Sequence, residues 1–274
     1  MKKVILITGI SSGFGKQTAR LLAKSGHSVY GTVRNNIETD AGINVLIMDL
    51  TNQESIIQAV GAVVRKEGRV DVLINNAGMH TGGPVETLPI EYLRLQMETS
   101  FMGMVLLTRE VLPVMRSHGG GMVINFSSIG GLMGLPFQGF YSAAKFAVEG
   151  FSEALRMETA RFNIKVVVIN PGDFHTNNSL NRRSYLAPSG PEDVYEEQFR
   201  RSLEIIEHDE GKGWAPEILA KKLTKIVECS KPRQRYIIAS VDQKLAVLLK
   251  KLLPGKLFRM ILASHYGILM RQRD

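Results

Sequence analysis

The chain has 274 residues, 44% of them apolar and 22% charged, which is ordinary for a soluble globular protein able to bury a sizeable core. The single cysteine, Cys229, excludes an internal disulfide, and the six histidines show no metal-ligand spacing, so no metal site is expected. The apolar run at the N-terminus stops at Thr8-Gly9, which is too short for a secretion signal, and no stretch approaches the roughly 20 apolar residues that span a bilayer. These features predict a cytoplasmic protein.

The net charge of +8 is unevenly distributed along the chain. Residues 211–274 hold 14 Lys and Arg against 4 Asp and Glu, whereas the first 210 residues are close to neutral. This excess has two readings, a solvated surface or an attraction to anionic lipid. Nucleic acid is not expected as a partner, because the basic residues are interleaved with Leu and Ile rather than with a nucleic-acid-binding motif.

Apolar runs and helical spacings alternate along the chain from its first residues. In chain order they predict a strand at 4–8, a helix at 16–25, strands at 27–33 and 44–48, a helix at 54–66, a strand at 71–75, a helix at 90–117, a strand at 122–126, a helix at 139–161, a strand at 165–169, a helix at 216–229 and a strand at 236–238. Alternation of this kind indicates an α/β fold, a Rossmann-type doubly wound parallel sheet.

One catalytic domain over residues 1–240 and a helical tail over 241–274 are the simplest organisation. Residues 174–213 are long, polar and poorly periodic, which favours a mobile substrate flap. The tail alternates Lys and Arg with large apolar residues, and this predicts amphipathic helices broken at Pro254-Gly255. Such helices pack on the protein, pack on a partner subunit or lie on a membrane surface; the sequence favours packing and leaves peripheral membrane contact open.

A glycine-rich turn joins the first strand to the first helix. Glycines there allow a tight turn and a close approach to a pyrophosphate, and the N–H groups at the helix start point at the phosphates. The spacing is G-x-x-x-G-x-G, and the residues expected at the cofactor are Gly9, Ser11, Ser12, Gly13, Phe14 and Gly15.

The end of the second strand indicates which dinucleotide binds. An NAD-preferring site carries Asp or Glu there, but this chain has Arg34, whose guanidinium suits a 2′-phosphate. We therefore expect NADP(H) as the cofactor. Asp49 and Leu50 follow the third strand, where they are expected to meet the adenine ring.

Tyr141 and Lys145 lie four residues apart on one predicted helix and so share a face. A phenol ordinarily titrates near pH 10, and a neighbouring ammonium stabilises the phenolate and lowers that pKa. The pair is therefore a candidate general acid/base. Ser128, at the end of a strand, is placed to hold the substrate oxygen.

The glycine turn, Asn75-Asn76-Ala77-Gly78, Ser128, Tyr141-x-x-x-Lys145 and Pro171-Gly172 occur in this order, and together they resemble the short-chain dehydrogenase/reductase family over about residues 3–240. The stretch from Ser127 to Pro136 looks most like the branch of 17-beta-hydroxysteroid and retinol dehydrogenases. The resemblance implies that Tyr141 exchanges the proton, that Lys145 also binds the nicotinamide ribose, and that Ser128 polarises the carbonyl. It further implies cofactor contacts at Asn76, Ala77, Gly78, Pro171, Gly172 and Thr176, and a homodimer or homotetramer.

One position departs from the family pattern. The family usually has Asn in the long helix before the active-site strand, and the matching residue here is Ser100. Every residue has a backbone carbonyl, so the proton relay that this residue serves can survive, but the side-chain amide is lost. Reduced or retuned activity is expected.

The substrate pocket implied by the resemblance has apolar walls, which suit a lipophilic aldehyde, ketone, steroid or retinoid. The candidate wall residues are Met133, Leu135, Phe137, Phe140, Phe174, Tyr185 and Phe199. For His80 and His175 a polar surface role is favoured over a place at the pocket. The chain is thus expected to be an NADP(H)-dependent oxidoreductase acting on CH–OH groups. The alternative is a non-catalytic NADP(H)-binding sensor or scaffold on the same fold.

Overall fold

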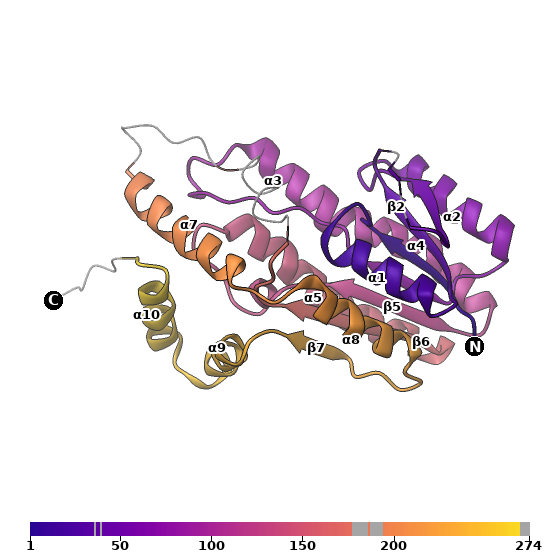
Figure 1. Ribbon diagram of the computed structural model, residues 1–274. Coiled ribbons are helices and arrows are strands. Elements are labelled where there is room, and N and C mark those ends of the chain that lie inside the picture. Colours follow the sequence, from indigo (N-terminus) through magenta and orange to yellow (C-terminus); the bar gives the residue numbers. More distant parts are fainter. Residues whose placement is uncertain (36, 39, 177–185, 187–193, 269–274) are drawn as a thin grey trace.

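A seven-stranded parallel sheet forms the centre of the computed structural model (Figure 1). The structure describes residues 1–35, 37, 38, 40–176, 186 and 194–268. The strand order is β3-β2-β1-β4-β5-β6-β7. The strands are β1 (Val4–Thr8), β2 (Ser28–Val33), β3 (Ile43–Ile47), β4 (Val72–Asn75), β5 (Gly121–Phe126), β6 (Ile164–Pro171) and β7 (Arg235–Ile238). All seven predicted strands are present, and the predicted Rossmann-type fold is confirmed.

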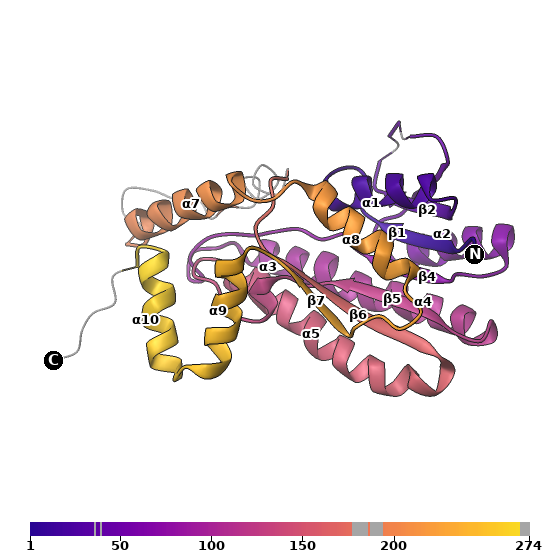
Figure 2. The same ribbon diagram turned by 60° about the horizontal axis from the view of Figure 1, so that its bottom comes forward.

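Helices cover both faces of the sheet (Figures 1 and 2). They are α1 (Gly13–Lys24), α2 (Gln53–Glu67), α3 (Ile90–Met97), α4 (Gly103–Ser117), α5 (Gly139–Thr159), α7 (Glu196–Gly211), α8 (Pro216–Glu228), α9 (Val241–Leu252) and α10 (Gly255–His265). Short 3-10 turns lie at Ile129–Gly131 and Ala160–Phe162. The helices α1 and α8 pack on one face, and α2 and α4 pack on the other.

The alternation of side chains along β1 explains the two layers. Ile5 and Ile7 point into the core beneath α1 and α8, whereas Val4 and Leu6 point into the core beneath α2 and α4. Because both faces are buried, the strand is apolar from Val4 to Ile7 and ends at the buried Thr8, as expected for a parallel sheet. The chain order reverses between β1 and β4, and ligands bind at such switch points, beyond the carboxyl ends of the strands.

Two elements differ from the sequence-based expectation. The helix expected over 90–117 is interrupted by a π-helical turn at Glu98–Met102, which separates α3 from α4. The segment 174–213, expected to be an irregular flap, contains α7, a helix of 16 residues. Residues 177–185 and 187–193 of that segment lie outside the described part of the chain.

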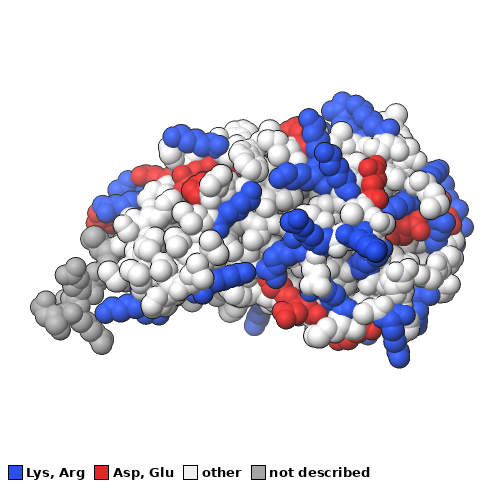
Figure 3. Space-filling view, turned by 90° about the horizontal axis from the view of Figure 1, so that it is seen from below, with Lys and Arg blue, Asp and Glu red and all other residues white. Residues whose placement is uncertain are grey.

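The predicted amphipathic tail forms the hairpin of α9 and α10, which lies at one end of the molecule (Figure 2). Pro254 is the N-cap of α10, so the predicted break falls between the two helices. In the space-filling view from below, Lys and Arg side chains are numerous and many of them cluster near the middle of the face (Figure 3). Among the described residues, no helix combines the length and the apolar character needed to cross a bilayer.

Candidate active site

A cavity of about 1120 Å³ lies at the carboxyl ends of the central strands. One end is lined by the loops after β1, β2, β3 and β4, and the middle by residues of α5 and the loops after β5 and β6. The other end is lined by α7, α9 and α10. The cavity therefore has room for an extended cofactor and a second molecule beside it.

The glycine turn has the backbone shape that a dinucleotide requires. Gly9 and Gly13 adopt φ values of 73° and 54°, which favour glycine. A Cβ on Gly9 would lie 3.0 Å from the Cα of Ala77, so the two loops can approach only because no side chain is present. The side-chain amide of Asn76 donates to the Thr8 carbonyl at 2.8 Å and ties the loops together.

The predicted cofactor residues are gathered on one stretch of the cavity wall. A Cβ on Gly15 would overlap the carbonyl oxygen of Gly9, so Gly15 serves close packing of helix α1 behind the wall and does not line it. The start of α1 at Gly13 aims its free N–H groups toward the cavity. The residues of this wall are Gly9, Ser11, Ser12, Gly13, Phe14, Arg34, Asp49, Leu50, Asn76, Ala77, Gly78, Pro171, Gly172 and Thr176.

Tyr141, Lys145 and Ser128 meet in the middle of the cavity. The Lys145 ammonium donates to the Phe126 carbonyl at 2.9 Å and lies 5.8 Å from the centre of the Tyr141 ring. Burial lowers the pKa of Lys145 to about 8, because desolvation disfavours its charged form. The Ser128 hydroxyl oxygen accepts a hydrogen bond from the Gly130 N–H at 3.1 Å, which fixes its position on the wall.

His80 also belongs to this centre. Its imidazole stacks on the Tyr141 ring with 3.9 Å between centroids, and its Nε2 is hydrogen-bonded to Gln138 Oε1 at 2.8 Å. The side chain is buried and lines the cavity, so the expected polar surface role for His80 is wrong. His175 is exposed, as that expectation had it. The sequence signal that could have placed His80 at the cavity is the Asn76-Ala77-Gly78 motif, which ends two residues before it.

Ser100 lies in the π-helical turn and does not line the cavity. Its hydroxyl oxygen accepts hydrogen bonds from Gln96 Nε2 at 2.8 Å and from the Met79 N–H at 3.2 Å. A Cβ on Gly78 would lie 3.5 Å from this oxygen and 3.7 Å from Lys145 Nζ. Gly78 therefore lies between the serine hydroxyl and the lysine amine. The sequence did not indicate that Gln96 takes part.

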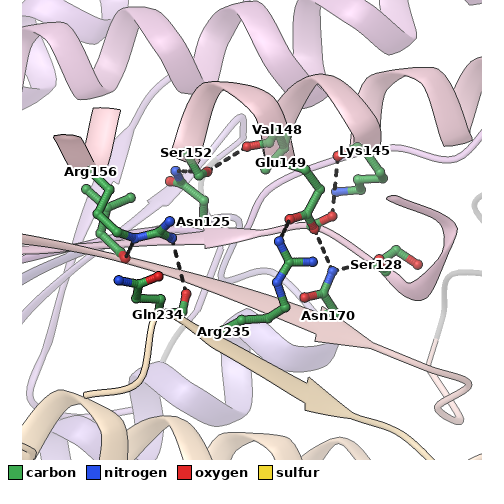
Figure 4. Close-up of polar contacts among 12 residues, drawn as sticks. Asn125, Ser128, Lys145, Val148, Glu149, Ser152, Arg156, Asn170, Gln234 and Arg235 are labelled. Atoms are coloured by element: carbon green, nitrogen blue, oxygen red, sulfur yellow. Dashed lines mark hydrogen bonds and ion pairs between the residues drawn. The ribbon is translucent and has the colours of Figure 1, made fainter. Parts of the chain in front are cut away.

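A buried carboxylate stands one helical turn beyond Lys145 (Figure 4). Glu149 accepts from the Asn170 side chain at 2.6 Å and pairs with Arg235 of β7 at 2.7 Å. Asn170 also donates to the Ser128 carbonyl at 2.9 Å, so these contacts join α5, β6 and β7 behind the catalytic wall. The negative charge of Glu149 raises the pKa of Lys145 and thereby opposes the larger effect of burial.

The predicted substrate residues divide into two groups. Met133, Leu135 and Phe174 line the cavity. Phe137 does not: it adopts φ 55° and packs on Phe199, with 5.4 Å between ring centroids. Phe140 and Phe199 are also absent from the cavity wall, and Tyr185 lies outside the described residues.

The far end of the cavity combines apolar and acidic side chains that the sequence did not single out. The apolar ones are Ile206, Leu245, Ala246, Leu249, Phe258, Ile261 and Leu262. Asp173 is largely buried there, and burial together with Glu210, Asp209 and Asp242 raises its pKa to about 7. Gln243 Nε2 donates to its carboxylate at 2.5 Å.

The model of the short chain dehydrogenase family matches residues 3–186, which is more than half of the chain. The chain is a member of the short-chain dehydrogenase/reductase family. This short-chain dehydrogenase/reductase is 46% identical over 266 residues to a 3-ketodihydrosphingosine reductase of Bacteroides thetaiotaomicron, with 97% of this chain and 98% of that one covered. The family expected from the motifs is thus confirmed.

Solved structures share the fold of this short-chain dehydrogenase/reductase. A short-chain dehydrogenase from Streptomyces avermitilis is 32% identical, with a TM-score of 0.81 and 96% of each chain covered. The protein ElxO with NADP bound is 25% identical, with a TM-score of 0.71, covering 87% of this chain and 97% of that one. The chain is accordingly an oxidoreductase of a family that uses a nicotinamide dinucleotide and acts on small substrates.

Proposed function

We propose that this enzyme uses NADPH to reduce the ketone of a long-chain amino ketone, with Tyr141 as the general acid. The observation that carries the proposal is the convergence of Tyr141, Lys145 and Ser128 on one cavity that is apolar beyond them. The glycine turn fits a dinucleotide, since Gly9, Ser12 and Gly13 line the cavity at the start of α1, where free backbone N–H groups suit phosphates. When bound there, the cofactor supplies the hydride that the carbonyl carbon receives.

Residues of the chain polarise and protonate the ketone oxygen of the substrate. The Ser128 hydroxyl donates a hydrogen bond to the ketone oxygen and polarises the carbonyl. The Tyr141 phenol then gives its proton to the developing alkoxide, and the Lys145 ammonium stabilises the phenolate that remains. His80, stacked on the Tyr141 ring, restricts the ring to one orientation.

NADP(H) is proposed over NAD(H) because Arg34, directly after β2, lies on the cavity wall at the position where NAD-preferring sites carry Asp or Glu. Asp49 is tied back by the Thr51 N–H and hydroxyl, at 2.9 and 2.8 Å, so its carboxylate is oriented within its own turn. The NADP found in ElxO, which shares the fold, supports the same choice.

The proposed substrate class follows from the relative named as a 3-ketodihydrosphingosine reductase and from the walls of the cavity. Such a molecule has a long alkyl chain, a ketone and an amine that is cationic at neutral pH. The apolar side chains of α9 and α10 suit the alkyl chain, and the carboxyl groups of Asp173 and Glu210 on the cavity wall favour a cationic ligand over a neutral one. A steroid or a retinoid carries no such cation.

The proposal also covers the oligomeric state of the enzyme and its location in the cell. The enzyme is proposed to form a homodimer or homotetramer, because Phe146 and Met157 on α5 are large apolar side chains that remain 45% and 72% exposed. A cytoplasmic location with peripheral membrane contact fits the single cysteine and the basic tail.

The test is NADPH oxidation with 3-ketodihydrosphingosine and with a matched long-chain ketone that lacks the amine. We expect turnover of the amino ketone, and we expect Tyr141→Phe to abolish it while NADPH still binds. The rival reading, a non-catalytic NADP(H) sensor, is favoured if NADPH binds tightly and neither these ketones nor a panel of hydrophobic aldehydes is turned over.

A further inference from the structure

Helices α9 and α10 each carry two apolar faces. One face packs inward, where Val247 and Phe258 are buried against Met133 of the active-site loop. The other face is exposed to solvent. On α9 it consists of Val241, Leu245, Leu248 and Leu252, and on α10 of Leu257, Met260 and Ile261, with exposed fractions from 44% to 82%. We call these seven residues the α9–α10 face.

The spacing shows that the α9–α10 face is built into the helices. Positions 241, 245, 248 and 252 recur at four, three and four residues and so form one stripe along α9. On α10, Leu257, Met260 and Ile261 stand at positions i, i+3 and i+4 and so share one side of that helix. Seven exposed large apolar side chains on two successive helices are unusual in a soluble monomer and indicate an interaction surface.

The charges carried by helices α9 and α10 are almost all of one sign. Five exposed cationic side chains belong to the same two helices, and they are Lys244, Lys250, Lys251, Lys256 and Arg259. Asp242 is the single acidic residue of the two helices. In the space-filling view from below, one end of the molecule is mostly uncharged, with Lys and Arg side chains and some Asp and Glu side chains at its border (Figure 3).

We propose that the α9–α10 face docks on an anionic lipid bilayer and that the substrate enters the cavity from that bilayer. Large apolar side chains insert between the headgroups, while the flanking cations attract the negative surface. This inference deepens the proposed function, on which its second half rests. The docking itself depends only on the surface of the tail.

The face is continuous with the cavity. Leu245 and Ile261 are 51% and 45% exposed, and both also line the cavity wall. An alkyl chain that leaves the bilayer beside them thus passes along apolar side chains to Leu249 and Phe258 without crossing water. Delivery by this route avoids the free-energy cost of bringing a long alkyl chain through water, which grows with each CH₂ group.

The alternative binding partner for the α9–α10 face is a second copy of the chain. A twofold interface would place this face against its own copy. Such an interface would bring two hairpins close together, each with five cations and Asp242 as the single acidic residue of its two helices. Charge complementarity therefore favours anionic lipid.

The test is co-sedimentation of the full chain with vesicles of phosphatidylcholine alone and of phosphatidylcholine mixed equally with phosphatidylglycerol. We expect strong binding to the mixed vesicles, weak binding to the neutral ones, and loss of binding at high salt. The variant Leu248→Glu/Leu252→Glu changes two residues that are exposed and do not line the cavity. Its partition to mixed vesicles should fall more than roughly tenfold, since each leucine contributes apolar burial.

Val85→Glu is the matched control, because Val85 is an apolar side chain of similar exposure outside the tail. It should bind vesicles like the parent. Lys251→Gln/Lys256→Gln should weaken binding roughly fivefold for each charge removed. NADPH binding should be unchanged in every variant, which shows that each is folded.

Equal affinity for both kinds of vesicle, or no binding to either, overturns the docking. The docking is also overturned if the parent binds no vesicles and the Leu248→Glu/Leu252→Glu variant no longer forms the parent's oligomer. That result assigns the face to a second copy of the chain. If the parent binds mixed vesicles but reduces no long-chain amino ketone, the docking stands and the proposed function fails.

Discussion

The His80 imidazole lies nearly parallel to the Tyr141 ring, with 16° between their planes and 3.9 Å between their centroids. Gln138 holds the imidazole from its other side through Nε2. In the proposed mechanism, this stacking positions the Tyr141 phenol for proton donation to the substrate.

We expect His80→Ala to lower kcat roughly 10- to 100-fold, since a small displacement of a catalytic group has effects of that size. The dissociation constant for NADPH should hardly change. His80→Phe, which restores a flat ring beside Tyr141, should recover part of the loss. Steady-state kinetics and cofactor fluorescence test this, and an unchanged kcat in His80→Ala would show that the stacking does not position the phenol.

The Lys145 ammonium is subject to two opposed effects, burial and the charge of Glu149. In Glu149→Gln only burial remains, so the pKa of Lys145 should fall below its value of about 8. Since neutral Lys145 no longer stabilises the phenolate, the alkaline limb of the kcat/KM profile should move to lower pH. Glu153→Gln, an exposed change on the same helix, is the control and should leave that limb in place.

Arg34 is expected to distinguish the two nicotinamide cofactors. Arg34→Ala should weaken NADPH about 10- to 100-fold, the usual size of a hydrogen-bonded contact to a charged group. NADH lacks the 2′-phosphate and should be affected less than about twofold. Isothermal titration with both dinucleotides measures this, and equal weakening of the two would refute the phosphate contact.

Asp173 is expected to make stability depend on pH. Its pKa is raised from 3.8 to about 7 by burial, so the folded protein holds this proton more tightly than the unfolded chain does. The free energy of unfolding should therefore decrease as pH rises from about 4 to about 7. Asp173→Asn should flatten this part of the curve, as followed by urea denaturation at several pH values. A slope equal to that of the parent would contradict the assignment.

The strands and the catalytic centre could be predicted because their signals are local. An unbroken apolar run such as Val4–Thr8 is what a strand buried on both faces requires. The four-residue spacing of Tyr141 and Lys145 requires only that the helix form. The π-helical turn around Ser100 has no such local sequence signal. It is accompanied by hydrogen bonds of Gln96 to Ser100 and to Met79, and Met79 belongs to a different segment of the chain.

Helix α7 could not be predicted for a related reason. Its buried positions are Phe199, Ser202, Ile206 and Glu210, at helical spacing, but two of the four are polar. The Ser202 hydroxyl donates to the Tyr266 carbonyl at 2.8 Å, a contact that only the folded tail supplies. Apolar periodicity therefore does not reveal a helix whose buried positions include polar side chains that hydrogen-bond to distant parts of the chain.

The walls of the cavity are divided along the chain, with the reacting groups before residue 186 and much of the far wall in α7, α9 and α10. Under the proposed function, the proton donor and the wall along the alkyl chain are therefore encoded largely in two successive stretches of the chain. Exchange of the later stretch between relatives would be a way to redirect this chemistry to ketones of another size, with the proton donor untouched.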